Sequence, residues 1–233
     1  MAPLRWSVMA QAPYRDMLVE GLGITLVLVV TTTVFSLASG SALAVARTHR
    51  TSAVRRLAHA VVETLRNVPG VFWLLFWFIL VPVLVPDPLG EKLNGLPHYP
   101  LIAAILGLTF NNTPYVADIV WAAVASTREE AISAAKLAGF SRWGVWRRVI
   151  LPEAVVASLP ALNARLTHNV KNTSLAMVIS VHDLTWQAQE IEAVTFAGLE
   201  VTTVVTLAYV VLALSFSTSL RWVEAAARTR RRR

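Results

Sequence analysis

Four long stretches without a formal charge constrain this chain more than any other feature of its sequence. They cover residues 21–46, 67–86, 93–117 and 201–220. A helix needs about 20 mostly apolar residues to cross the hydrocarbon core of a bilayer, and each stretch is long enough. Only 15% of the 233 residues are charged, whereas a soluble domain carries about 25%. The sequence therefore predicts an all-α membrane protein.

A fifth, weaker stretch covers residues 149–172 and contains Glu153, Arg165, His168 and Lys171. With it, the chain has about five transmembrane helices in one domain over residues 1–233. The expected spans are approximately 18–46, 67–86, 99–124, 149–172 and 200–222. The stretch 82–100 between the second and third spans is rich in proline and glycine and is expected to form an irregular external loop.

The basic residues predict the orientation of these spans. Fifteen of the 21 Lys and Arg residues lie in the loop after the first span, in the 125–148 loop and from Arg221 to the C-terminus. Cytoplasmic loops are enriched in Lys and Arg. Alternate segments are basic, which requires an odd number of spans, with the N-terminus outside and the C-terminus in the cytoplasm. This alternation supports the weak fifth span.

The charge of +7 needs no nucleic acid as a partner. The basic tail 223–233 would lie against an anionic inner leaflet, which is a sufficient partner for it. The chain has no cysteine, which excludes thiolate metal sites and cysteine nucleophiles. No paired carboxylates or nucleophile–base set stand at useful spacing, so we predict no catalytic residues and no metal site.

The cytoplasmic segment 128–152 carries the most informative pattern. Ala131, Ala134, Ala135 and Ala138 share one helical face made of methyl groups. Gly139 follows at the position of a helix C-cap glycine. Ser141 is placed to cap a second short helix. Such a smooth helix at the membrane surface suits a groove in another protein, and an ordinary amphipathic connector is the alternative.

The same segment resembles a family motif. Its A-A-(3)-G-(10)-I-L-P spacing resembles the EAA loop of bacterial ABC-importer permeases. Residues 21–47 are similar to the first span of these permeases, and residues 61–69 to the start of their second. The segment 171–191 is similar to the K-[DN]-[ST]-S-L segment of the polar amino acid uptake subfamily. The chain thus resembles a histidine/glutamine/glutamate permease-like family.

The resemblance implies a function and partners. The chain would be the multi-pass membrane subunit of an ATP-driven importer of polar amino acids in the bacterial inner (cytoplasmic) membrane. It would pair with a second permease, identical or homologous. Two cytoplasmic ATPase subunits would receive the 129–147 loop, and a periplasmic amino-acid-binding protein would deliver substrate. No G-x-x-x-x-G-K-[ST] loop is present, so ATP and Mg²⁺ would bind the partner subunits and this chain would be neither an enzyme nor a cofactor-binding protein.

The resemblance also implies which residues couple the chain to the ATPase. The family's glutamate of E-A-A is Ser133 here, and Glu129 and Glu130 lie about one turn earlier. The expected coupling residues are Glu130, Ala134, Ala135, Gly139, Ile150, Leu151 and Pro152.

Polar residues inside the third and fourth spans predict the substrate pathway, because charges there should not face lipid. Asp118 would meet the ammonium group and Arg165 the carboxylate of an amino acid. The alternatives are a buried Asp118–Arg165 ion pair, or an Arg165 side chain that extends outward to the lipid headgroups. By resemblance, residues 171–174 lie at a break after the fourth span. The pathway residues predicted are Asn111, Tyr115, Asp118, Asn163, Arg165, His168, Lys171, Asn172, Thr173 and Ser174.

A second function stays open. A self-contained channel or an ion-coupled secondary carrier for small polar solutes would also need polar residues in its spans. Such carriers usually have more helices and inverted repeats, and neither is visible here. Asp183, Glu190 and Glu192 are expected to form a solvated external face.

Overall fold

The computed structural model describes residues 4–232. This part of the chain forms helices and turns without a strand, which confirms the all-α prediction. Residues 1–3 of the predicted domain and residue 233 of the predicted basic tail lie outside the described residues. The single-domain boundaries and the orientation of the termini stay predictions.

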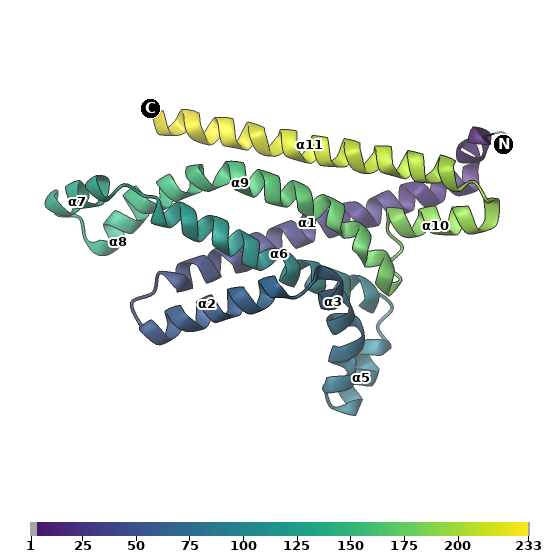
Figure 1. The fold of residues 1–233 in the computed structure, drawn as a ribbon, viewed down its shortest axis with the longest axis horizontal. Coiled ribbons are helices and arrows are strands. Elements are labelled where there is room, and N and C mark those ends of the chain that lie inside the picture. The colour runs from purple at the N-terminus through teal and green to yellow at the C-terminus, as the bar shows by residue number, and fades with distance from the viewer. Residues whose placement is uncertain (1–3, 233) are drawn as a thin grey trace. The chain divides into compact units, whose positions relative to one another are not determined.

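Four long helices dominate the chain (Figure 1). They are α1 (Ala12–Arg47), α6 (Tyr99–Ala125), α9 (Leu151–Asn172) and α11 (Gly198–Arg232). The shorter α-helices are α2 (Ser52–Asn67), α3 (Gly70–Leu75), α4 (Val81–Leu84), α5 (Asp87–Asn94), α7 (Glu129–Leu137), α8 (Arg142–Val145) and α10 (Leu184–Thr195). Two 3₁₀ segments, Trp6–Ala10 and Thr173–Ile179, and two π turns, Phe76–Leu80 and Trp146–Ile150, complete the chain.

Within residues 4–232, three helical stretches are long and apolar enough to cross a membrane, namely Ala12–Arg47, Arg142–Ile179 and Gly198–Thr229. Two broken pairs, Ser52–Asn67 with Gly70–Leu84 and Asp87–Asn94 with Tyr99–Ala125, raise the number to as many as five. The predicted five spans agree with this upper number.

The expectation of an irregular loop over 82–100 is wrong, because α5 occupies residues 87–94. Pro86 and Pro97 lie between helices, whereas Pro82, Pro88 and Pro100 lie in the first turns of α4, α5 and α6. Proline is tolerated there because the first turn leaves its N–H groups without intrahelical partners anyway.

Contacts divide the described chain into two compact units. The first comprises Met1–Phe35, Val68–Asn112 and His168–Leu214, and the second comprises Ser36–Asn67, Thr113–Thr167 and Ser215–Arg233. Four of the five boundaries fall within α1, α6, α9 and α11, and the fifth falls directly after α2.

The first unit has two apolar clusters. In one, Leu28 of α1, Leu74 of α3 and Leu108 of α6 are fully buried together with residues of the 3₁₀ segment 173–179. In the other, Ile191 of α10 and Val201 of α11 pack against the N-terminal turns of α1. Each cluster joins helices that are distant in sequence, so this unit depends on long-range packing.

In the second unit, small residues let α1 approach α6 closely. A β-carbon on Gly40 would stand 2.6 Å from the β-carbon of Val116. One residue earlier, the Ser39 hydroxyl lies 2.6 Å from the Thr113 hydroxyl. Only glycine at position 40 permits this crossing.

Both π turns end two residues before a proline. Phe76–Leu80 precedes Pro82, and Trp146–Ile150 precedes Pro152. Proline has no N–H to bond the carbonyl four residues earlier, and a widened turn accommodates that missing bond. The second of these turns connects α8 to α9.

Candidate functional site

Asp118 lies at the centre of a charge network in the second unit. Its carboxylate accepts a hydrogen bond of 2.5 Å from Arg47 at the end of α1 and one of 3.0 Å from Arg66 of α2. Arg66 also pairs with Glu63 at 2.7 Å. The Asp118 carboxylate therefore links α1, α2 and α6 within this unit.

Arg47 is the buried member of this network, with 5% of its side chain exposed. Its Nε donates to Nδ1 of His59 at 3.1 Å. Its guanidinium lies 4.7 Å from the centre of the Trp121 ring, which supplies a cation–π contact. The predicted pathway role of Asp118 stays a prediction, but a substrate ammonium group would have to compete with two guanidinium groups for it.

The structure brings two other predicted pathway residues together. The guanidinium of Arg165 lies 3.7 Å from the centre of the Tyr115 ring. Tyr115 is on α6 and Arg165 is on α9, so the stack joins predicted pathway residues of two helices within the second unit. Asn163, on α9, donates to the carbonyl of Ser217 on α11 at 3.2 Å.

The other predicted pathway residues belong to the first unit. Asn111 is buried, and its amide side chain is the first group that a β-carbon on Gly70 would meet, at 3.0 Å. His168 and Lys171 are exposed, and Asn172 is half-buried.

The predicted break after the fourth span is present as a change of helical geometry. α9 ends at Asn172, and the 3₁₀ segment Thr173–Ile179 follows it. The hydroxyls of Thr173 and Ser174 each donate 2.8 Å hydrogen bonds to carbonyls three residues earlier. These bonds satisfy backbone acceptors at the point where the hydrogen-bonding pattern changes.

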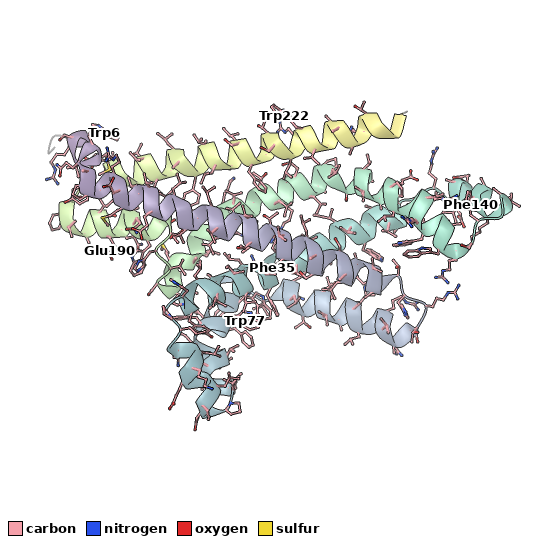
Figure 2. The ribbon with its side chains drawn as sticks, turned by 180° about the vertical axis from the view of Figure 1, so that it is seen from behind. Trp6, Phe35, Trp77, Phe140, Glu190 and Trp222 are labelled. Carbon is pink, nitrogen blue, oxygen red and sulfur yellow. The ribbon has the colours of Figure 1, made fainter. Side chains whose placement is uncertain are left out.

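In the coupling segment, residues 129–147, the residues that end one helix and cap the next lie where the sequence predicts. Gly139 has a φ of +83°, and the N–H of Phe140 bonds the carbonyl of Ala135 at 3.1 Å across it. This is a Schellman ending for α7. The Ser141 hydroxyl then accepts from the N–H of Gly144 at 3.2 Å and caps α8. Figure 2 shows Phe140 at the turn between the two helices.

The alanine face of α7 is partly uncovered by the rest of the chain, with Ala131 half-buried. Ala135 is buried, whereas Ala134 and Ala138 are exposed. Leu137, beside them, is 90% exposed. Leu151 and Pro152 are also exposed, and Ile150 is half-buried. An exposed apolar surface of this kind is typical of a contact with another protein.

Asp183 is buried, so the expectation that it belongs to a solvated face is wrong for this residue. Its carboxylate caps α10, accepting from the N–H of Trp186 at 2.9 Å and from the hydroxyl of Tyr209 at 3.0 Å. Glu190 and Glu192 are exposed, as expected, and Figure 2 marks Glu190 on α10. Burial raises the pKa of the Asp183 carboxyl from 3.8 to about 6, although these hydrogen bonds favour its charged form.

This shift predicts how stability depends on pH. Because the pKa is higher in the folded chain than in the unfolded one, stability should fall as pH rises from about 4 to about 6. The shift of about two units corresponds to at most about 3 kcal/mol. We expect the melting temperature of the purified chain to decrease over this pH range, and we expect Asp183→Asn to remove that part of the decrease. Equal pH dependence in both proteins would contradict the assignment.

Sequence reasoning missed two functional features. It did not connect Arg47 and Arg66 with Asp118, because the polar pattern of one helix does not show which residues of other helices lie beside it. It also assigned Asp183 to solvent, because the nearby glutamates are indeed exposed. The signal for Asp183 was its position directly before α10, where an aspartate is a favoured N-cap.

The sequence of this chain matches one protein family and several named transport proteins. The family described as "Binding-protein-dependent transport system inner membrane component" matches residues 36–229. The chain is 32% identical over 212 residues to the glutamine transport system permease protein GlnP of Escherichia coli (strain K12), covering 91% of this chain and 93% of that protein. It is 30% identical over 200 residues to the glutamate/aspartate import permease protein GltK of Escherichia coli O6:H1, covering 82% and 87%.

Solved structures show the same fold. An amino acid ABC transporter crystallised with histidines matches with a TM-score of 0.79 and 25% identity, covering 94% of this chain and 97% of that one. An inward-facing MetNI methionine ABC transporter matches with a TM-score of 0.72 and 22% identity, covering 93% and 99%, which supports the fold alone.

Proposed function

Because the chain belongs to the family of binding-protein-dependent transport system inner membrane components, we propose that it is the membrane-spanning subunit of an ATP-driven importer of polar amino acids. The named substrates of its relatives, glutamine and glutamate/aspartate, support that substrate class. The proposal includes a bacterial inner-membrane location, with the N-terminus outside and the C-terminus in the cytoplasm. The basic loops support this orientation.

The partners follow from the same reasoning. A second permease, identical or homologous, would complete the pathway. Two cytoplasmic ATPase subunits would bind ATP and Mg²⁺, and a periplasmic binding protein would supply the amino acid. This chain would contribute the membrane pathway and a docking element for the ATPase.

The α7–α8 turn is the observation that carries the proposal. Its Schellman ending at Gly139 and its cap at Ser141 hold two short helices in one geometry. α7 packs against both α8 and the π turn Trp146–Ile150, which leads directly into α9. A push on α7 therefore reaches a membrane helix through packed contacts, which is what an ATPase on the cytoplasmic side requires.

The proposal is tested by uptake into proteoliposomes that contain the chain with its ATPase and binding protein. We expect labelled glutamine, glutamate, aspartate or histidine to enter only when ATP is supplied to the ATPase side. An ATPase variant unable to hydrolyse ATP is the control and should show no uptake. Accumulation by this chain alone, driven by an ion gradient, would contradict the proposal and favour a secondary carrier.

A further inference from the structure

A large pocket in the second unit lies beside α7, and the proposed contact of α7 with the ATPase does not account for it. It has a volume of about 1220 Å³. Its walls come from the end of α1 and the loop that follows, from the end of α6, from α7 and from the α8–π-turn segment.

The polar wall of this pocket is cationic. Arg50, Lys136 and Arg142 line it, and His49 is beside them. None of the described residues that line the pocket carries a carboxylate. All three cationic side chains are exposed, so they can turn toward a ligand. The pocket is therefore complementary to an anionic group.

The remaining wall is apolar and aromatic. Val45, Val124 and Ile150 line the pocket together with Trp143 and Trp146. Trp143 is 69% exposed, although tryptophan side chains are on average largely buried in folded proteins. The pocket thus offers an apolar surface next to its cationic groups, which suits an amphiphile better than a free inorganic anion.

Several lining residues lie close to the ends of candidate membrane-spanning helices. Val45 is near the end of the candidate span Ala12–Arg47, and Arg142 begins the candidate span Arg142–Ile179. Val124 is next to the last residue of α6. Tryptophan and basic residues at the ends of spans are enriched at the level of lipid headgroups.

The pocket and the alanine face lie on different sides of α7. Ile132 and Lys136 line the pocket and are four residues apart, so they share one side of the helix. Ala134 lies two residues from each of them, about 200° around the helix at about 100° per residue. A ligand in the pocket would therefore leave Ala134, an exposed residue of the alanine face, free for the ATPase.

We propose that this pocket binds an anionic phospholipid. The phosphate would lie between Arg50, Lys136 and Arg142, and the part of an acyl chain nearest the headgroup would pack against Trp143 and Trp146. The proposal is independent of the transported substrate. Its competitor is direct cover of the pocket by the ATPase subunit, which the test below separates from it.

Native mass spectrometry of the full-length chain, purified with the subunits that accompany it, measures the lipid directly. We expect phosphatidylglycerol to bind saturably, and phosphatidylcholine with the same acyl chains to bind weakly. The double variant Arg50→Gln/Arg142→Gln should bind phosphatidylglycerol about 30-fold more weakly, at about 1 kcal/mol for each cation and about 1.4 kcal/mol per tenfold.

The matched control is Arg56→Gln/Arg147→Gln, which removes the same charge from exposed positions outside the pocket lining. It should keep the wild-type affinity for phosphatidylglycerol. Equal affinities in the wild type and both double variants would overturn the proposal, as would equal losses in both variants.

A second measurement does not depend on the folding of the double variant. The chain has no cysteine, so Trp143→Cys introduces a single thiol. Phosphatidylglycerol should slow the reaction of this thiol with a water-soluble maleimide, and phosphatidylcholine should not. Protection that requires the ATPase subunit and is the same in both lipids would assign the pocket to a protein contact and overturn the proposal.

Discussion

Replacing Asp118 with alanine is expected to lower the free energy of unfolding by about 3–5 kcal/mol, because it leaves a buried cation without its counter-charge. Arg47 has only 5% of its side chain exposed and holds the Asp118 carboxylate at 2.5 Å. The bond to His59 and the Trp121 contact cannot neutralise a full positive charge. We expect a large drop in the melting temperature of the purified chain and in the amount of folded protein recovered.

Two further variants test whether the loss of stability comes from the unpaired charge of Arg47. Arg66→Gln removes the partner of Asp118 whose side chain is 40% exposed, and should lower stability far less, because solvent screens an exposed ion pair. Arg47→Met/Asp118→Leu removes both charges and should recover most of the lost stability, because a buried ion pair is often no more stable than apolar residues of similar size. A wild-type melting temperature for Asp118→Ala would contradict this account. So would an Arg47→Met/Asp118→Leu variant that is less stable than Asp118→Ala.

The same double variant tests the predicted pathway role of Asp118. If the carboxylate only neutralises Arg47, a chain that has regained its stability should also regain ATP-driven uptake. If Asp118 contacts the substrate ammonium group, uptake should remain lost although the protein is folded. The ratio of uptake to folded protein distinguishes the two.

Replacing Gly139 with valine is expected to reduce ATP-driven uptake by about an order of magnitude. Gly139 has a φ of +83°, a left-handed conformation that costs other residues about 1–2 kcal/mol, and β-branched residues more. A cost of about 2 kcal/mol lowers the population of the intact turn relative to an unwound one by about 30-fold. Without that turn, α7 and α8 lose their common geometry, so ATP hydrolysis should continue while uptake falls.

Gly144→Ala is the matched control for this prediction. A β-carbon there would meet the Phe140 ring at 3.4 Å, an ordinary contact. Alanine also favours helix over glycine by about 1 kcal/mol. Uptake should therefore stay near the wild-type rate. Equal rates for Gly139→Val and the wild type would show that a defined α7–α8 turn is not needed for coupling.

Local sequence signals predicted the coupling segment well. Gly139 ends α7 and Ser141 caps α8, as their positions indicated, because capping depends on residues close together in sequence. The long uncharged stretches likewise predicted α1 and α11, since length and hydropathy alone decide which helices can span a bilayer.

Interactions between distant helices could not be predicted in the same way. The sequence suggested Arg165 as the one ion-pair partner for Asp118, whereas Arg47 and Arg66 engage its carboxylate. Which helices lie beside α6 depends on the packing of small residues such as Gly40, and a single sequence does not show that packing. The stack of Arg165 on Tyr115 likewise depends on which helix lies beside α6, so the sequence did not predict it.

Accessibility of residue 134 tests the central claim most directly. Ala134→Cys gives the cysteine-free chain one thiol on the exposed alanine face of α7, and Ser52→Cys on α2 serves as the control. A membrane-impermeant maleimide should label the thiol at position 134 from the cytoplasmic side only, and the bound ATPase should slow that labelling at least about tenfold without affecting position 52. Labelling of residue 134 from the outside, or at a rate that the ATPase does not change, would contradict the account.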